Sequence, residues 1–350
     1  MTVRHRSAAA VADAQDRSSR CAVAAPARPR LGFLGTGWIG RDRMRAVAAS
    51  GVAEVALLAD PSTERLQAAA ADVPGVVLAS GLDGLLDASL DGIVIATPSA
   101  LHAEQAIAAL EAGLGVFCQK PLARTAAETE RVLGAARRAD RLLGVDLSYR
   151  HTAASAALRE RITAIGPVHA VELVFHNAFG PDKPWFRDPV LAGGGCVVDL
   201  GIHLVDLLLW MLDFPRVEHV TARRWLGGRP ADGGDAEDFC LATLELGGGA
   251  VARLACSWFS HEGRDAVIEA TFRGRDGALS MHNFNGSFYD FGAELREGTA
   301  ATQIAAPPDA WGGRAAVEWA RRLAAGERYD ARGAEQLAVV AATLDRIYGR

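Results

Sequence analysis

Short apolar runs alternate with longer alanine-rich stretches through the first part of the chain, from residue 31 to about residue 150. Runs that are apolar throughout, such as Ile93-Val94-Ile95, are typical of strands buried on both faces of a parallel sheet. The stretches between them repeat their apolar positions with a helical period. This alternation predicts a doubly wound α/β domain. We expect strands at residues 31–34, 55–59, 76–78, 92–96, 114–118 and 142–147, and helices at residues 39–49, 62–72, 99–112 and 125–138.

After residue 150 the alternation stops, and the pattern predicts a second domain of the α+β class over residues 151–350. Several runs there repeat apolar residues at every second position and are separated by glycine-rich turns, as in a largely antiparallel sheet. A loop rich in proline, glycine and aromatic residues precedes an apolar helix. We expect strands at residues 168–179, 239–246, 250–257 and 266–273, and helices at residues 152–164, 196–212, 309–325 and 333–348.

The length of 350 residues also favours two domains over one. The net charge of −5 is uneven, because residues 1–30 hold six arginines against two aspartates and the remainder is more acidic. That remainder shows no basic face, so we expect no nucleic-acid partner. An apolar run of about 18 residues is missing, which argues against a membrane span. Residues 1–30 have no periodic apolar face, and we interpret them as a disordered extension or as a start codon assigned too early.

The cysteines are odd in number and include no C-x-x-C pair. We therefore expect reduced, mostly buried thiols in a cytoplasmic protein, with neither a disulfide framework nor a metal site. The five are Cys21, Cys118, Cys196, Cys240 and Cys256.

A glycine motif, Gly35-Thr36-Gly37-Trp38-Ile39-Gly40, directly follows the first predicted strand and opens the first predicted helix. In this context G-x-G-x-x-G indicates a dinucleotide site: Gly35 permits the tight turn, Gly37 lets the backbone approach the pyrophosphate, and Gly40 allows close helix–strand packing. The alternative is that the three glycines serve the turn alone.

Asp60 stands 20 residues after Gly40, at the end of the next predicted strand. Its carboxylate would accept hydrogen bonds from an adenosine ribose and repel a 2′-phosphate. The following Pro61-Ser62-Thr63 offers no Arg or Lys to receive such a phosphate. The sequence therefore favours NAD over NADP. Asp60 could also cap the helix over residues 62–72, and the two roles are compatible.

Three polar residues interrupt the otherwise apolar helix over residues 196–212. Asp199, His203 and Asp206 stand at i, i+4 and i+7, which predicts one stripe on one face of a buried helix. A carboxylate one turn from an imidazole would fix its tautomer and raise its basicity, as a general base requires. A structural hydrogen-bond network would explain the same residues.

Lys120 follows the predicted strand over residues 114–118, at the end where open α/β sheets bind ligands. Partial burial would allow it to share a proton with a substrate hydroxyl. Its neighbour Pro121 makes a cis peptide bond plausible. A solvated surface lysine is the alternative.

Four motifs taken together resemble the glucose–fructose oxidoreductase and inositol dehydrogenase (Gfo/Idh/MocA) family. They are G-T-G-W-I-G, A-T-P-S-A-L-H at residues 96–102, C-Q-K-P at residues 118–121, and G-G-G-C-V-V-D-L-G-I-H-L-V-D at residues 193–206. The resemblance covers the chain from about Arg30 to its end, and the last motif is its most specific part. Glu237-Asp238 adds minor support.

The resemblance implies a Rossmann domain and an α+β domain whose open sheet commonly forms an interface of a homodimer or homotetramer. It also implies reversible NAD(P)-dependent oxidation of a secondary hydroxyl on a sugar, cyclitol or related polyol. Lys120 would hydrogen-bond the reacting oxygen, Asp199 would position the substrate or tune the pair, and His203 would accept the proton. The residues implied near the cofactor, besides Lys120 and the glycine motif with Trp38 and Ile39, are Thr97, Pro98, His102 and Gln119.

Two positions depart from the family pattern. Glu is more common where this chain has Gln119, and Asn is more common where it has Ser99. Glutamine keeps hydrogen-bonding capacity for a ribose but loses the charge, so the cofactor affinity is open.

Substrate contacts are expected at the domain junction, where Arg and Trp can hydrogen-bond or stack on a sugar. Two other functions stay open: a glycosidase that uses bound NAD transiently, and a nucleotide-sensing regulator without chemistry. Trp185, and Trp38 within the glycine motif, could instead be packing residues. The expected substrate contacts are Tyr149, Arg150, Asn177, Lys183, Trp185 and Arg187.

Overall fold

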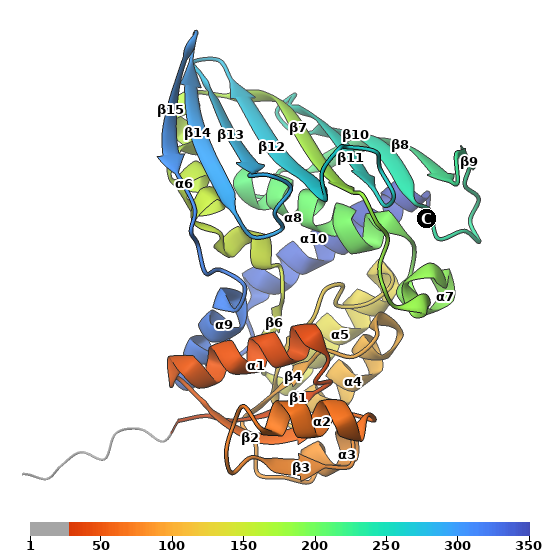
Figure 1. The fold of residues 1–350 in the computed structure, drawn as a ribbon, viewed down its shortest axis with the longest axis vertical. Coiled ribbons are helices and arrows are strands. Elements are labelled where there is room, and N and C mark those ends of the chain that lie inside the picture. Colours follow the sequence, from red (N-terminus) through yellow and green to blue (C-terminus); the bar gives the residue numbers. More distant parts are fainter. Residues whose placement is uncertain (1–27) are drawn as a thin grey trace, which may run out of the picture.

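A computed structural model describes residues 28–350, so nearly all of the extension expected at residues 1–30, with Cys21, lies outside the described residues. The first domain is built on a parallel six-stranded sheet of order β3-β2-β1-β4-β5-β6, which confirms the doubly wound fold (Figure 1). The strands are β1 (Arg30–Leu34), β2 (Glu54–Ala59), β3 (Val77–Ala79), β4 (Gly92–Ile95), β5 (Gly115–Cys118) and β6 (Leu143–Val145).

Helices cover both faces of this sheet, and the two faces bury separate apolar clusters. The sequence pattern did not predict one short helix, Leu82–Leu86, because five residues make too few turns to show a helical period. The helices of this domain are α1 (Trp38–Ser50), α2 (Thr63–Ala70), α3 (Leu82–Leu86), α4 (Ser99–Glu111) and α5 (Ala126–Ala139), of which α3 was not expected.

The second domain is a nine-stranded sheet of order β15-β14-β13-β12-β7-β11-β10-β8-β9. All neighbours pair antiparallel except β7 and β11, which run parallel at its centre. The strands are β7 (Val168–Asn177), β8 (Val217–Leu226), β9 (Arg229–Pro230), β10 (Phe239–Leu246), β11 (Val251–Ser257), β12 (Ala266–Gly274), β13 (Ala278–Asn283), β14 (Phe291–Glu297) and β15 (Ala300–Ala305).

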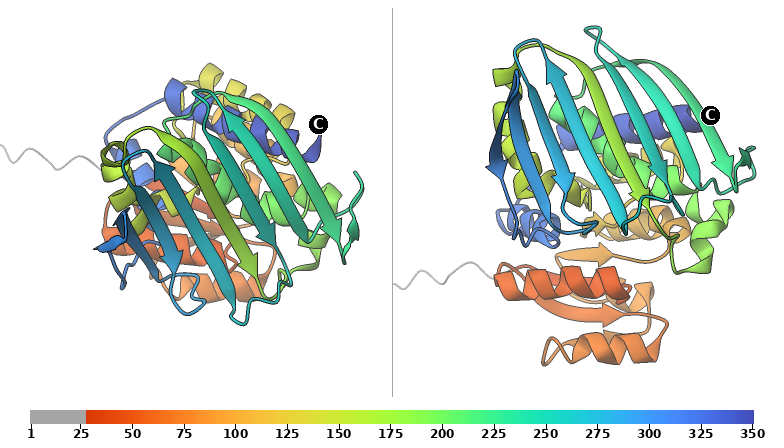
Figure 2. Two further views of the ribbon diagram at one scale, coloured as in Figure 1. Left: turned by 90° about the horizontal axis from the view of Figure 1, so that it is seen from above. Right: turned by 45° about the horizontal axis from the view of Figure 1, so that its top comes forward.

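One face of the large sheet packs on helices, and the other is open in the single chain (Figure 2). The covering helices lie between this sheet and the first domain, so the two domains meet through a helical layer (Figure 1). They are α6 (Ala153–Arg161), α8 (Ile202–Met211) and α10 (Ala331–Tyr348), with the short α7 (Pro189–Ala192) at the edge.

Helix α9 (Arg314–Ala324) returns to the first domain, although it lies far along the chain. Its Trp319 packs against strand glycines: a Cβ at Gly92 or Gly144 would come within 2.8 Å of the indole ring. The core of the first domain is therefore completed by a helix that the linear division at residue 150 assigns to the second.

The helical stretch Pro189–Met211 is long and apolar enough to cross a membrane, which corrects the expectation that the chain holds no such run. However, 83% of its most apolar window is buried inside the protein, beneath the large sheet. Its apolar character therefore has a sufficient explanation as a core helix.

Candidate functional site

The loop after β1 uses each of its three glycines differently. Gly35 has φ +91°, a conformation that L side chains rarely adopt. A Cβ on Gly40 would lie 2.1 Å from the carbonyl oxygen of Gly35, so the start of α1 can approach the strand only with glycine there. A Cβ on Gly37 would meet no atom within 4 Å, because this residue faces the open cleft. The structure thus leaves room for a ligand at Gly37 and none at Gly40.

Two alanine substitutions separate these roles. We expect Gly40→Ala to lower both the melting temperature and NADH binding, because its Cβ overlaps backbone. Gly37→Ala should keep the wild-type melting temperature and still weaken NADH binding, because its methyl occupies the space that a pyrophosphate needs. Thermal melts and NADH titrations check both. Unchanged NADH binding by Gly37→Ala would contradict a dinucleotide at this loop.

Asp60 lies at the end of β2 and lines the same cleft. Its Oδ2 accepts from the Thr36 N–H at 2.7 Å and its Oδ1 from the Ser62 N–H at 2.8 Å, so the carboxylate ties the glycine loop to the start of α2. The cap of α2 is Ser62, whose side chain accepts from the Arg65 N–H. Each Asp60 oxygen keeps acceptor capacity for a ribose.

Two arginines also line this end of the cleft, and the sequence reasoning missed them because it stopped at Thr63. Arg45 is paired with Asp72. The Arg65 side chain has no ion-pair partner within residues 28–350. A cation is therefore within reach of a 2′-phosphate, against the expectation that none is.

The cleft between the domains has a volume of about 1350 Å³, larger than the roughly 300–1,000 Å³ of ordinary small-molecule pockets. It has room for a dinucleotide and a second molecule. At the end away from Asp60, the ammonium of Lys120 donates to the Asp199 carboxylate at 2.8 Å and to its carbonyl at 2.7 Å. The indole of Trp258 donates to the other carboxylate oxygen at 3.1 Å. The Lys120–Pro121 peptide bond is cis, as expected.

His203 lies beside this pair, against the ring of Tyr149 at 4.6 Å between centroids. Burial, helped by the charges of Lys120 and Arg43, holds the pKa of His203 well below its ordinary value. The imidazole is therefore neutral at neutral pH and can accept a proton. Its Nδ1 is buried with no hydrogen-bond partner within residues 28–350.

The expected coupling of Asp199 to His203 is wrong. Residues Val197–Gly201 form a π-helical turn before α8, which shifts the helical period and turns the Asp199 carboxylate to Lys120. The pKa of His203 is consequently lowered by its surroundings, whereas the sequence reasoning expected a raised basicity.

Asp206 does not line the cleft with the other two, although it follows His203 by one turn of α8. It is 1% exposed and forms a buried ion pair with Arg150, which also donates to Gln336 on α10. Neither member of this pair lines the cleft. Arg150 is therefore a structural link between helices, against the expectation of a substrate contact.

The glycines before α8 allow the backbone to pack closely against Tyr348 and Glu237. A Cβ on Gly194 would lie 2.0 Å from the Tyr348 hydroxyl, and one on Gly195 would lie 2.0 Å from the Glu237 carbonyl. The fully buried Glu237 carboxylate accepts from the N–H groups of Gly195 and Val197, at 3.1 and 2.9 Å, and from the Tyr348 hydroxyl at 2.8 Å. It thus anchors the turn that carries Asp199. From the sequence, Glu237-Asp238 served only as support for the resemblance, and this role was not predicted.

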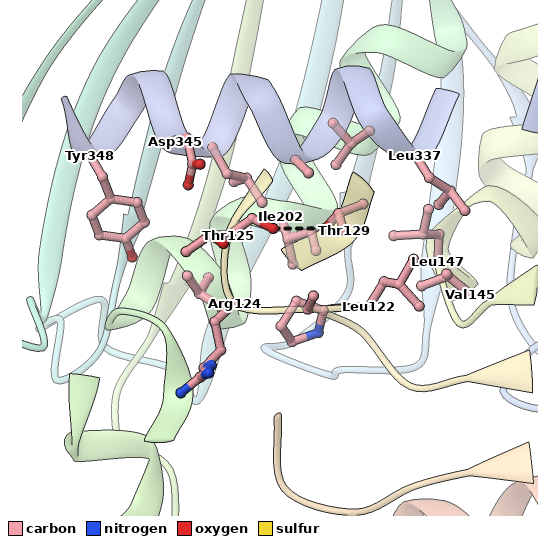
Figure 3. A pocket seen from close by; sticks show the side chains of 16 residues that line it. Leu122, Arg124, Thr125, Thr129, Val145, Leu147, Ile202, Leu337, Asp345 and Tyr348 are labelled. Atoms are coloured by element: carbon pink, nitrogen blue, oxygen red, sulfur yellow. Dashed lines mark hydrogen bonds between the residues drawn. The ribbon is translucent and has the colours of Figure 1, made fainter. Parts of the chain in front are cut away.

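A second cavity of about 30 Å³ lies behind the Lys120–Pro121 bond, between the following loop, α8 and α10. Figure 3 shows Leu122, Ile202 and Leu337 around it, with Arg124 pointing away from it. Its walls are mostly apolar, and its volume is too small for a ligand larger than about two waters. We interpret it as a packing gap.

Trp38 is 66% exposed at the cleft, so it is not a packing residue. Within residues 28–350 no group of three or more His, Cys, Asp or Glu could hold a metal, and the four described cysteines are free and buried. The predicted site residues that line the cleft are Gly35, Gly37, Trp38, Ile39, Asp60, Thr97, Pro98, His102, Gln119, Lys120, Tyr149, Asn177, Lys183, Trp185, Asp199 and His203; Gly40, Arg150 and Arg187 do not.

Two family models match the chain in order. Residues 29–147 match the oxidoreductase family with an NAD-binding Rossmann fold, and residues 155–280 match the GFO/IDH/MocA C-terminal domain. Among curated proteins, the putative UDP-kanosamine synthase oxidoreductase subunit of Amycolatopsis mediterranei is 31% identical over 258 residues, 68% of this chain and 71% of that protein.

An inositol 2-dehydrogenase of Acidiphilium cryptum is 33% identical over 190 residues, and the match spans only 54% of its length. Among solved structures, levoglucosan dehydrogenase in complex with NADH and levoglucosan aligns with a TM-score of 0.76 at 23% identity, over 91% of this chain and 97% of that one. GenD2 from gentamicin A biosynthesis, in complex with NAD, aligns with a TM-score of 0.76 at 24% identity, over 93% and 95%. At these identities the structures support the fold.

Proposed function

Because this chain belongs to the GFO/IDH/MocA family of oxidoreductases, we propose that it is an NAD-dependent dehydrogenase of sugars, cyclitols or related polyols. The observation that carries the proposal is the convergence of Lys120, Asp199 and His203 at one end of a cleft whose other end holds the glycine loop and Asp60. The inositol, glucoside and levoglucosan dehydrogenases among its relatives support the substrate class.

The residues of the cleft fit a nicotinamide dinucleotide. Gly37 faces open space at the start of α1, where free N–H groups favour a pyrophosphate. Asp60 offers acceptors at the end of β2 for the adenosine ribose. Thr97, Pro98 and Gln119 line the path toward Lys120. When bound, the nicotinamide would supply the hydride acceptor or donor.

In the oxidation direction, the secondary hydroxyl lies between Lys120 and His203. Lys120, held by Asp199, donates a hydrogen bond to the hydroxyl oxygen and stabilises the negative charge that grows on it. Neutral His203 takes the hydroxyl proton while the C–H hydrogen leaves as hydride, and the C–O bond becomes a carbonyl. Reduction runs through the same contacts in reverse, with His203 returning the proton.

The choice of NAD over NADP rests on the Asp60 carboxylate, with Arg65 as the opposing feature. We expect wild-type protein to bind NADH more tightly than NADPH, read by energy transfer from tryptophan to nicotinamide. Asp60→Ala should relax this preference toward NADPH, and Arg65→Ala should weaken only NADPH. Tighter NADPH binding by the wild type would contradict the NAD assignment, and binding of neither would contradict the dehydrogenase.

We also propose that the protein works in the cytoplasm as a homodimer or homotetramer. The buried free thiols of the described chain support a reducing compartment. The open face of the large sheet exposes apolar residues such as Leu241 and Val251, at 41% and 40%, which supports an interface there.

A further inference from the structure

A buried carboxylate that the mechanism above does not use lies at the catalytic end of the cleft. Asp146 follows β6, is 1% exposed and lines the cleft. Its Oδ2 accepts from the Arg43 Nε at 2.6 Å and from the Gln119 Nε2 at 2.5 Å. Arg43 and Gln119 are thus joined through one carboxylate oxygen of Asp146, next to Lys120.

Within this group the charges of Arg43 and Asp146 offset each other, and the amide at position 119 adds none. Arg43 comes from α1 and is 5% exposed, so its guanidinium needs a buried anion close by. Asp146 provides that anion, and the other contact of Arg43 goes to Asp42 at the rim of the cleft. Gln119 then adds a hydrogen bond to Asp146 without adding a charge.

The bond to Asp146 also fixes which way the amide of Gln119 points. An amide presents a donor at one end and an acceptor at the other. The Nε2 donor is committed to Asp146, so the Oε1 acceptor is the end that remains. Within residues 28–350 the Oε1 atom of Gln119 has no hydrogen-bond partner, and it is not fully buried. It therefore stands as an accessible acceptor in the wall of the cleft.

We propose that Asp146 is a positioning residue for the cofactor: with Arg43 it orients Gln119 so that Oε1 accepts a hydrogen bond from the nicotinamide half of the dinucleotide. This inference rests on the proposed function. Asp60 lies at the adenosine end of the cleft and Gln119 adjoins Lys120 at the other, so the donors within reach are the hydroxyls and the carboxamide of the nicotinamide nucleoside.

Asp146 explains why this chain has glutamine at position 119, where glutamate is more common in the family that it resembles. Glutamate there, the more common residue in the proteins this chain resembles, would put a second carboxylate in hydrogen-bond contact with Asp146. Two buried like charges at this distance repel strongly. In this chain glutamine at position 119 therefore avoids that repulsion, and the carboxylate on this side of the cleft is Asp146.

The test is a charge exchange between the two positions, with the dissociation constant of NADH and the melting temperature measured for each protein. Gln119→Glu should weaken NADH binding about tenfold or more through carboxylate repulsion, and Asp146→Asn about tenfold through loss of the fixed amide. The double variant Gln119→Glu/Asp146→Asn should return to within about threefold of the wild type, because the two positions again carry one carboxylate and one amide.

Two further variants separate positioning from general destabilisation. Asp206→Asn breaks the buried pair with Arg150 outside the cleft, and it should lower the melting temperature while the NADH dissociation constant stays unchanged. Gln119→Met removes the acceptor without adding charge, so it should weaken NADH binding at a nearly unchanged melting temperature even if Gln119→Glu fails to fold.

The inference is overturned if Gln119→Glu or Gln119→Met binds NADH as tightly as the wild type. It is also overturned if the double variant binds no better than Asp146→Asn, or if Asp206→Asn weakens binding as much. These results require a wild type that binds NADH or NADPH. A wild type that binds neither overturns the proposed function itself, so the two failures are distinct.

Discussion

Replacing His203 by asparagine should lower kcat for polyol oxidation by about 10²–10⁴-fold while the NADH dissociation constant stays near the wild-type value. The imidazole lies beside the Lys120–Asp199 pair, and its low pKa keeps it ready to accept a proton. Both ring nitrogens of His102, the other histidine in the cleft, contact backbone carbonyls. Asparagine preserves a polar side chain of similar reach but cannot take up the proton. Lys120→Met should cost a comparable factor, because it removes the cation that stabilises the growing alkoxide.

The measurement is initial-rate oxidation with a polyol chosen from a panel of myo-inositol, methyl glucoside and levoglucosan, together with the NADH titration. The pH profile adds a second check. A solvated histidine base would lose activity near pH 6.5, whereas the lowered pKa of His203 places the fall in kcat/KM at more acidic pH. Asp206→Asn on the same helix is the matched control and should keep most of kcat. Wild-type turnover by His203→Asn would refute the assignment of the base.

Much of the fold follows from periodicity, since its strands and helices are long enough to show it. The six parallel strands, the glycine loop and Asp60 lie where their pattern predicts. Features that depend on distant parts of the chain could not be predicted in this way. Trp319 completes the core of the first domain from a helix near the C-terminus, because three strand glycines leave space that only the folded chain reveals.

The site shows the same division. The spacing correctly predicted Asp199 and His203 at the cleft. It did not predict the π-helical turn before α8 or the pairing of Asp199 with Lys120, nor that Asp206 pairs with Arg150 outside the cleft. A helical wheel assumes 3.6 residues per turn, so it cannot anticipate one wide turn. The chemistry of these side chains could be predicted from the residue types, whereas their partners depend on the backbone conformation, which the spacing does not determine.

The anchor beneath the catalytic turn leads to the largest expected effect on stability. Glu237→Ala should lower the free energy of unfolding by about 3 kcal/mol or more, because it removes the carboxylate that accepts from three buried donors. Those donors are the N–H groups of Gly195 and Val197 and the hydroxyl of Tyr348. Among residues 28–350 only the Gly195 N–H keeps another acceptor, the Tyr348 hydroxyl at 3.3 Å. The turn they hold carries Asp199, so kcat should fall as well, through loss of the geometry that fixes Lys120.

Urea unfolding of the whole chain measures the first effect, and single-temperature kinetics well below the transition measure the second. Thr125→Ala is a matched control, since Thr125 also caps a helix, α5, by accepting from the Glu128 N–H at 3.1 Å. It should cost about 1 kcal/mol with kcat unchanged. If Glu237→Ala cost no more than this control, the carboxylate would be a replaceable cap, and the position of Asp199 would have to be set by Lys120 and Trp258 alone.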